Sequence, residues 1–297
     1  MTHHKGIILQ KIGKYKIIDC NFCKFIHIYP IPSDSTLSKF YINDYYKKTK
    51  PQYIKKNETE IEYWNILFDE KLETIEQYLQ SRTKKILDIG CGPGFFLRRA
   101  KKNGWQILGI EPSNLAATYA QRQGIPVIID FFQNINLKNL GKFNAIHMFD
   151  VLEHTSNPIE ILQNCYSLLK KGGIIVVEIP NDFNILQKTV QKVLKKHEYW
   201  LAPPQHINYF NFSSLTKLLQ KIGFKIILKE STFPLEIFLL MGHDYIGNDK
   251  VGKKKHRERM KLEINLKNGG LNPLKRKIYQ YFAELGIGRT AIIYAKK

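Results

Sequence analysis

Three glycines spaced two residues apart form a candidate ligand-binding loop. They lie at positions 90, 92 and 94 of the run Asp88-Ile89-Gly90-Cys91-Gly92-Pro93-Gly94, between an apolar stretch that predicts a strand and a pattern that predicts a helix. Glycine lets a backbone approach a ligand closely, and the first turn of a helix offers free N–H groups. We therefore predict that this loop binds a cofactor through Asp88, Gly90, Cys91, Gly92 and Gly94.

The spacing of this loop excludes two common nucleotide-binding patterns. A dinucleotide-binding fingerprint requires glycine at the sixth position, where Phe95 stands. A phosphate-binding P-loop requires a Lys-Ser or Lys-Thr pair after its glycines, and that pair is absent here. The pattern Gly-x-Gly-x-Gly, preceded by an acidic residue, remains to be assigned.

Three more acidic residues end predicted strands. Glu111 ends the second predicted strand, and Asp130 ends the third. Asp150 ends the fourth strand. Open α/β sheets bind their ligands at the carboxyl ends of the strands, so we predict that all three contact the cofactor. The alternative for each is a helix cap.

Two histidines are candidates for a general base, because imidazole titrates near neutral pH. His154 follows Asp150 and Glu153 at the same predicted edge of the sheet, and His206 lies in the polar segment 203–208. We predict catalytic roles for both. The alternatives are a structural or capping role for His154 and a pocket-lining role for His206.

The elements that position these residues alternate between short apolar runs and helical patterns. This alternation predicts a Rossmann-like α/β fold with a seven-stranded, mostly parallel sheet and helices on both faces. The predicted strands are 85–89, 106–110, 127–129, 143–149, 173–179, 225–229 and 290–297, and the predicted helices are 58–79, 95–102, 114–123, 158–169 and 215–222. Ser113 and Asn157 are candidate N-caps, and Gly172-Gly173 is expected to end the fourth of these helices.

The last predicted strand makes residues 232–289 an insertion between two strands of the sheet, which we expect to cover the substrate. We divide the chain into an N-terminal region, 1–57, and a main domain, 58–297, that contains this insertion. The insertion carries the densest basic cluster, Lys250–Lys261. This cluster favours a solvated helix or a patch that binds anions.

Composition narrows the class of protein. The 297 residues are enough for one substantial core, and the net charge of +20 comes from lysines spread along the whole chain. No apolar run approaches the ~20 residues of a spanning helix. The run Ile7–Leu9 is also too short for the core of a signal peptide. Four cysteines do not make a disulfide framework in a chain of this length, so we expect a cytoplasmic protein.

The glycine loop, together with the acids that follow it, resembles the class I S-adenosylmethionine-dependent methyltransferases. The resemblance covers about 84–229, and it implies S-adenosylmethionine as the cofactor. It also implies that Glu111 accepts from both ribose hydroxyls of this cofactor and that Asp130 accepts from its adenine amino group. Within that class the chain is similar to the ubiquinone O-methyltransferase type and to bacterial methyltransferases of sugar and surface-glycan pathways. A looser similarity extends to 20–46 and 203–210. The resemblance as a whole implies transfer of a methyl group to a small molecule. A sugar or surface-polymer precursor is one candidate acceptor. A phosphorylated or nucleotide-linked acceptor would suit the basic cluster Lys250–Lys261.

Two alternative functions stay open at this point. An RNA methyltransferase would suit the charge. However, the motif Asp/Asn-Pro-Pro-Tyr/Phe, which follows the fourth strand in enzymes that modify base amines, is replaced by Phe149-Asp150-Val151-Leu152. We therefore do not expect nucleic acid as a partner. The second alternative is a catalytically silent module that binds the cofactor.

The N-terminal region carries a single Cys-x-x-Cys pair, Cys20 and Cys23. Sugar-methylating relatives often begin with two such pairs that form a zinc ribbon. Here the first pair is missing, and only His3, His4 and His27 stand where they could substitute. Structural zinc needs four ligands, so we expect a ribbon remnant that packs without a metal. We expect a lid helix and an aromatic loop that carries Tyr45 and Tyr46 to follow it, near the cofactor cleft.

Overall fold

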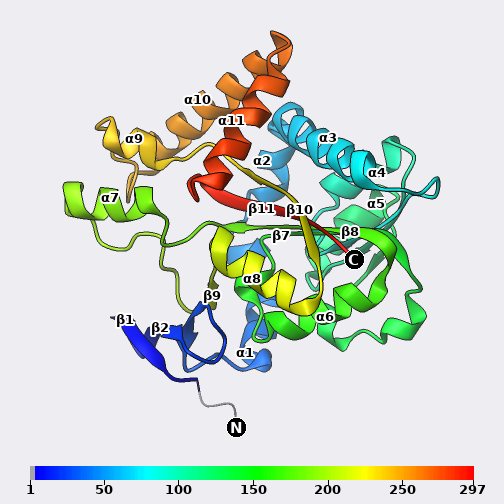
Figure 1. Ribbon diagram of the computed structural model, residues 1–297, viewed down its shortest axis with the longest axis horizontal. Coiled ribbons are helices and arrows are strands. Elements are labelled where there is room, and N and C mark those ends of the chain that lie inside the picture. The colour runs from blue at the N-terminus through cyan, green and yellow to red at the C-terminus, as the bar shows by residue number, and fades with distance from the viewer. Residues whose placement is uncertain (1–3) are drawn as a thin grey trace.

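The computed structural model describes residues 4–297, apart from the side chains at positions 34, 39, 40, 43, 44 and 48. A seven-stranded sheet runs through the middle of the molecule, with helices on both faces (Figure 1), which confirms the predicted fold class. The order of its strands is β10-β11-β8-β7-β4-β5-β6. Six of these strands run in the same direction, and β11 runs opposite to them. Their bounds are β4 Lys85–Ile89, β5 Gln106–Ile110, β6 Val127–Ile128, β7 Phe143–Phe149, β8 Leu169–Pro180, β10 Lys225–Ser231 and β11 Thr290–Lys296.

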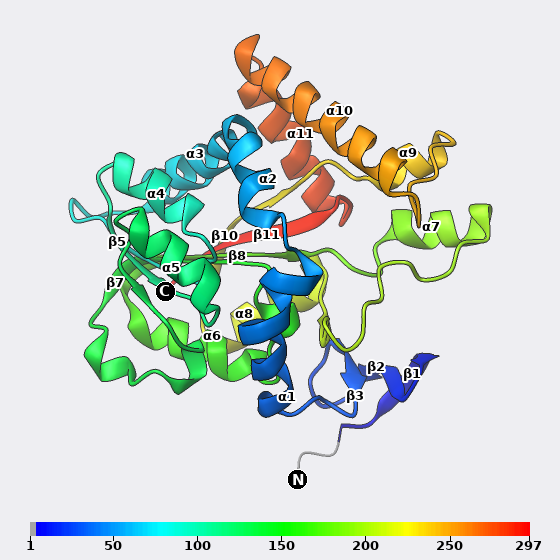
Figure 2. The ribbon, with the colours of Figure 1, turned by 180° about the vertical axis from the view of Figure 1, so that it is seen from behind.

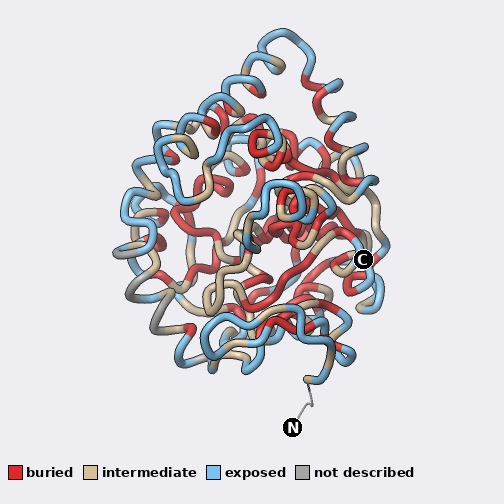
Figure 3. The backbone as a smooth tube through the Cα atoms, turned by 90° about the vertical axis from the view of Figure 1, so that its left-hand side faces the viewer, coloured by how far each residue is buried: buried red, intermediate tan, exposed pale blue. Residues whose placement is uncertain are grey.

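Alternate residues of each central strand pack in two different hydrophobic cores, one on each face of the sheet. In β4, Ile86 packs with α3 (Ile61–Tyr78) and α4 (Phe95–Lys102), and Leu87 packs with α6 (Pro158–Leu168) and α8 (Phe212–Ile222). This is the twofold periodicity of a strand that is buried on both faces. Figure 3 shows the buried backbone concentrated in the middle of the molecule and the exposed backbone around it.

Several predicted boundaries shift in the structure. The predicted helix 58–79 is two helices, α2 (Tyr53–Thr59) and α3, and α8 begins at Phe212 because Asn211 caps it through a bond from the Ser214 amide. Asn157 caps α6 as predicted, whereas the Ser113 side chain makes no capping bond to α5 (Asn114–Arg122). The prediction that Gly172-Gly173 ends α6 is wrong. That helix ends at Leu168, because the buried Leu169 already pairs with β7.

A second, smaller sheet is formed mainly by the N-terminal region. Its strands, all antiparallel, follow the order β1-β2-β3-β9, with bounds β1 Gly6–Ile12, β2 Tyr15–Cys20, β3 Ile26–Tyr29 and β9 Asn208–Tyr209. The next segments are α1 (Asp34–Lys39) and the π-helical segment η1 (Phe40–Thr49). In Figure 2 the small sheet lies at the opposite end of the molecule from α10 and α11.

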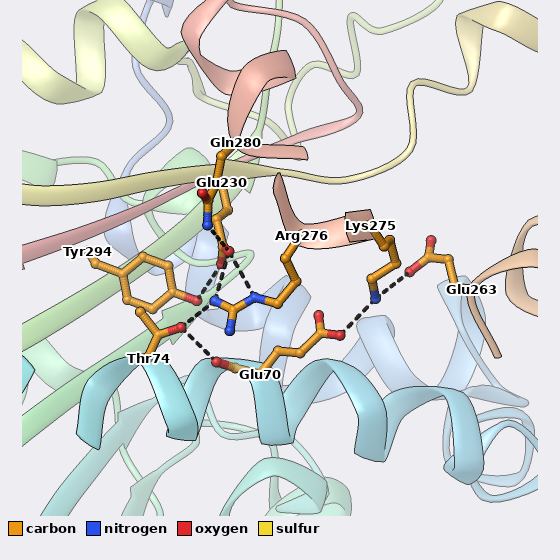
Figure 4. A network of polar contacts seen from close by, with 8 residues as sticks. All are labelled: Glu70, Thr74, Glu230, Glu263, Lys275, Arg276, Gln280 and Tyr294. Atoms are coloured by element: carbon orange, nitrogen blue, oxygen red, sulfur yellow. Dashed lines mark hydrogen bonds and ion pairs between the residues drawn. The ribbon is translucent and has the colours of Figure 1, made fainter. Parts of the chain in front are cut away.

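The predicted insertion folds into α9 (Glu236–Leu240), α10 (Asp249–Asn268) and α11 (Asn272–Glu284), between β10 and β11. Figure 4 shows how polar contacts hold α11 against α3 and β10. Lys275 Nζ lies 2.8 Å from Glu70 Oε1 and 3.6 Å from Glu263 Oε2, and Arg276 binds Glu230 Oε1 at 2.7 Å. The remaining short elements are α7 (Ile185–Leu194), η2 (Phe132–Asn134), η3 (Leu137–Asn139) and η4 (Leu152–His154). Within the described part of the chain, no helix has the length and apolar character to cross a membrane.

Candidate active site

A cavity opens at the carboxyl ends of β4, β5 and β7, where the predicted site residues gather. Its lining includes Asp88, Gly90, Cys91, Gly92, Glu111, Asp130, Asp150 and His154. Two predicted residues, Gly94 and His206, are not among the described residues that line it. Strands distant in the sequence end side by side at this edge because β4 pairs with both β5 and β7.

The glycine loop is held in a shape that only glycine adopts without strain. Gly90 has a φ of 70°, and a Cβ built on it would lie 2.6 Å from Val151 Cγ2. Gly94 has a φ of 77°, and its Cβ would lie 3.0 Å from Ala120 Cβ, so this glycine serves the packing of the loop on α5. The Gly90 and Cys91 amides both donate to the carbonyl of Ile110, which fixes the loop to the end of β5.

Glu111 is tied directly to the glycine loop. Its Oε2 accepts from the Gly92 amide at 2.9 Å, and its Oε1 accepts from the Ser113 amide at 2.9 Å. A carboxylate oxygen has two lone pairs, so each oxygen keeps one acceptor site for a ligand in the cavity. Burial raises the pKa of Glu111 to about 7, against the pull of these two amides.

Asp88 has a partner that the sequence analysis missed. His147 of β7 places Nδ1 2.7 Å from Asp88 Oδ1, and its ring stacks on Phe96 with 3.9 Å between centroids. Both side chains are almost fully buried and both line the cavity. The available signal was a histidine in the mostly apolar stretch of β7, but the pairing itself depends on the register of β4 against β7.

Asp130 and Asp150 lie at the cavity in different surroundings. Asp130 Oδ1 accepts from the Phe131 amide at 2.7 Å and from Asn134 Nδ2 at 2.8 Å, so it also shapes the turn that follows β6. Asp150 has a φ of 53°, and its amide donates to the Glu178 carbonyl. Its side chain is open to the cavity but enclosed by protein, and burial raises its pKa to about 6.

His154 is oriented as an acceptor at the cavity. Its Nδ1 lies 2.7 Å from the carbonyl oxygen of Gln205. A carbonyl only accepts, so Nδ1 carries the proton and Nε2 keeps its lone pair. Burial lowers the pKa of His154 to about 4, which keeps the ring neutral at neutral pH.

Glu153, next to His154, faces inward. It is 1% exposed, its Oε1 lies 3.8 Å from His154 Nε2, and burial together with Asp150 raises its pKa well above the usual range. Burial therefore favours the uncharged form of this carboxyl.

His206 lies behind His154. The two rings meet edge to face, with centroids 4.9 Å apart, and burial lowers the pKa of His206 to about 3. The segment that carries it holds the His154 loop through Asn208, whose Nδ2 donates to the carbonyls of Leu152 at 2.8 Å and Thr155 at 2.7 Å. No role was predicted for Asn208, which the sequence placed only in the polar segment 203–208.

Aromatic residues between 41 and 53 close one side of the cavity. Tyr41, Tyr45 and Tyr46 of η1 and Tyr53 of α2 all line it, so the aromatic loop that carries Tyr45 and Tyr46 lies at the cavity. The Tyr46 hydroxyl reaches the glycine loop, 2.9 Å from where a Cβ of Gly92 would stand. Lys50 lies over the rings of Tyr45 and Tyr53 at 5.6 and 5.7 Å.

The insertion does not cover this cavity, contrary to expectation. None of the described residues that line it comes from 232–289. The reason lies in its contacts. α10 packs on α3, with Arg259 over the ring of Tyr63 and with His256 Nε2 3.1 Å from Oε2 of Glu60, the residue before α3. α11 packs on β10. The basic cluster Lys250–Lys261 is therefore part of a helix that braces α3.

The charge of the lining favours a cationic ligand. It includes four carboxyl side chains, those of Asp88, Glu111, Asp130 and Asp150, against one lysine, Lys50. A sulfonium and an amino group, the two cationic groups of S-adenosylmethionine, match this balance. The acceptor sites that Glu111 keeps also suit the hydroxyls of its ribose, so the residues present fit this cofactor.

Comparison with known proteins agrees with this geometry. The methyltransferase-domain family matches residues 63–229. A ubiquinone biosynthesis O-methyltransferase of Actinobacillus pleuropneumoniae serotype 7 is 31% identical over 153 residues, and the match covers 44% of this chain and 65% of that protein. One from Coxiella burnetii (strain Dugway 5J108-111) is 27% identical over 167 residues, which cover 53% of this chain and 70% of that protein.

Two solved structures share the fold. Magnesium protoporphyrin IX methyltransferase from Synechocystis PCC 6803 aligns with a TM-score of 0.55 at 13% identity, over 89% of this chain and 100% of that one. The plantazolicin methyltransferase BpumL aligns with a TM-score of 0.53 at 16% identity, over 88% and 93%. The sheet and its cavity thus define a class I methyltransferase fold, the class whose cofactor is S-adenosylmethionine. The chain belongs to the methyltransferase-domain family.

Proposed function

We propose that this chain transfers a methyl group from S-adenosylmethionine to a hydroxyl group of a small-molecule acceptor. The observation that carries the proposal is the placement of His154, whose lone pair on Nε2 is held at the cavity by the bond from Nδ1 to Gln205. The bound cofactor would supply an electrophilic methyl group. The chain would hold the cofactor with the glycine loop, Glu111 and Asp130, and exclude water with the tyrosines of η1.

His154 would accept the hydroxyl proton at Nε2 as the acceptor oxygen attacks. A general base must be unprotonated and within hydrogen-bond reach of the proton it removes. Burial keeps His154 unprotonated at neutral pH, and it also makes the ring a weaker base than an ordinary imidazole. Glu153 and His206 would position this ring, since both lie against it and neither is among the described residues that line the cavity.

The choice of a hydroxyl acceptor rests on the relatives, which are O-methyltransferases. The aromatic lining, with Trp64 and Phe149 beside the tyrosines, suits a flat apolar acceptor. A sugar or surface-polymer precursor stays a prediction. The basic cluster Lys250–Lys261 is not among the described residues that line the cavity, so it no longer supports a phosphorylated or nucleotide-linked acceptor. The phosphates of such an acceptor would also lie in a cavity rich in carboxyl groups. The cytoplasmic location also stays a prediction.

The test is transfer of a labelled methyl group from S-adenosylmethionine into a metabolite extract, with mass spectrometry of the product. We expect a labelled methyl ether on a small molecule. Label that enters RNA instead, with retention on RNA that falls steeply with salt, would favour the alternative of an RNA methyltransferase. Cofactor binding by calorimetry without transfer to any acceptor would favour the silent module.

A further inference from the structure

Four side chains of the small N-terminal sheet converge on one point. His4 precedes β1, Cys20 ends β2, Cys23 lies in the following turn and His27 lies in β3. One ligand atom from each lies within 4.8 Å of the others, and this is the one such group found in the described part of the chain. His3, the remaining candidate from the sequence, lies outside the described residues.

The three distances from His4 Nδ1 to the other ligand atoms lie close to the edges of a coordination tetrahedron. His4 Nδ1 lies 3.2 Å from His27 Nε2, 3.4 Å from Cys23 Sγ and 3.8 Å from Cys20 Sγ. With zinc–nitrogen bonds of about 2.0 Å and zinc–sulfur bonds of about 2.3 Å, tetrahedral geometry separates ligand atoms by about 3.3–3.8 Å. The cluster therefore has space for one ion at its centre.

The surrounding backbone prepares the ligands. The Cys23 amide points at Cys20 Sγ at 3.4 Å, and the turn continues through Lys24, which has a φ of 64° and donates to the Cys20 carbonyl. His27 donates from Nδ1 to the Ile28 carbonyl at 2.8 Å, which leaves Nε2 as the ligand atom. A partner of this kind on the second ring nitrogen is typical of histidines that bind metals.

The small sheet has little else to stabilise it. Its hydrophobic core consists of five buried residues, of which Ile17, Ile28 and Leu37 come from the N-terminal region. A group of this size buries too little apolar surface to hold a fold alone, and a metal is a common supplement.

We propose that His4, Cys20, Cys23 and His27 bind one structural zinc ion. Two thiolates and two imidazoles favour zinc over oxygen-seeking cations, and four protein ligands leave no open position for catalysis. On binding, both thiols would lose their protons to solvent, and no electrons would be transferred. The expectation that the ribbon packs without a metal rested on a missing second ligand pair, which His4 and His27 supply.

The metal would also support the candidate active site. β3 pairs with β9, where His27 lies opposite Asn208, and the Ile28 amide donates to the Ile207 carbonyl at 2.9 Å. Asn208 in turn holds the loop of His154. Loss of the ion should therefore loosen the His154 loop as well as the ribbon.

The first measurement is the metal content of the full chain, produced without a histidine tag, by mass spectrometry of the elements. We expect about one zinc per chain in the wild type and less than about one fifth of that in Cys20→Ser and His27→Ala. Cys165→Ala and the exposed His243→Ala are matched controls that should keep the ion. The proposal would be overturned if the wild-type chain contained no zinc even after incubation with the ion, since the four side chains would then form a metal-free cluster held by hydrogen bonds.

A second measurement does not depend on variants that fold. Cobalt bound to the wild-type chain should show the strong visible bands of a tetrahedral ion and a thiolate charge-transfer band. A weak octahedral spectrum without charge transfer would overturn the proposal, and so would stoichiometric zinc in Cys20→Ser. Cys23→His should keep the ion with a weaker charge-transfer band.

Discussion

His154 Nδ1 donates to the carbonyl of Gln205 at 2.7 Å, a bond between two segments that are 51 residues apart. This bond fixes the tautomer of the ring, so that Nε2 remains an acceptor at the cavity. The chain belongs to the methyltransferase-domain family. The two histidines of the candidate site lie in different places relative to the cavity. His154 faces the cavity, and His206 lies behind it.

Replacing His154 with Ala should lower kcat about 10²- to 10⁴-fold without changing the affinity for the cofactor, because only the proton-accepting group is lost. The pKa of His154 in the folded chain is about 4, below its ordinary value, so the ring stays neutral until the pH falls through about 4. The kcat of the wild type should therefore fall on the acid side near that pH. His206→Ala should lower kcat less. Single-turnover rates at saturating cofactor measure both effects, and an unchanged rate in His154→Ala would remove the base from this site.

Replacing Gly92 with Leu should abolish cofactor binding while the fold survives. The side chain would enter the cavity beside Tyr46, at a φ of 53° that costs about 1 kcal/mol for a non-glycine residue. Calorimetric titration with S-adenosylmethionine measures the loss. Gly104→Leu is the matched control, because its φ of 80° imposes a similar strain but nothing lies within 4 Å of its Cβ. Equal affinities in the two variants would show that the loop does not contact the cofactor.

Cofactor affinity should fall at acid pH because of Glu111. Its pKa of about 7 lies above the ordinary value, so the carboxylate that we propose as the acceptor of the ribose hydroxyls is lost as the pH falls through 7. Affinity should then fall about tenfold for each pH unit below that value. Glu111→Gln should bind weakly with little dependence on pH between about 8 and 6. A wild-type affinity that is flat over this range would contradict the role of Glu111.

Replacing Asn208 with Ala should destabilise the protein by about 1–3 kcal/mol, because the carbonyls of Leu152 and Thr155 lose their donor in a buried site. Urea unfolding measures this change, and turnover should fall with it because the His154 loop loosens. Asn134→Ala, which removes one exposed bond to Asp130, is the control and should stay within about 0.5 kcal/mol of the wild type.

Replacing Lys275 with Ala should destabilise the chain by about 3–5 kcal/mol, since Glu70 and Glu263 would face each other without a buried cation. Lys277→Ala, at an exposed position of the same helix, should have almost no effect. Thermal unfolding of the two variants compares them. Similar melting temperatures would mean that the insertion is not held by this network.

The sequence by itself determined the seven strands of the main sheet and most of the helices between them, the glycine loop and the acids at the strand ends. These follow from local rules: the periodicity of apolar residues, the conformations open to glycine, and the fact that parallel strands end at one edge. Only the tertiary structure decided which side chains meet. His147 reaches Asp88 through the register of β4 and β7, the insertion packs on α3 instead of over the cavity, and His4 completes the cluster of Cys20 and Cys23. Such contacts join residues far apart in the chain, and their geometry depends on how whole elements pack, which local patterns do not encode.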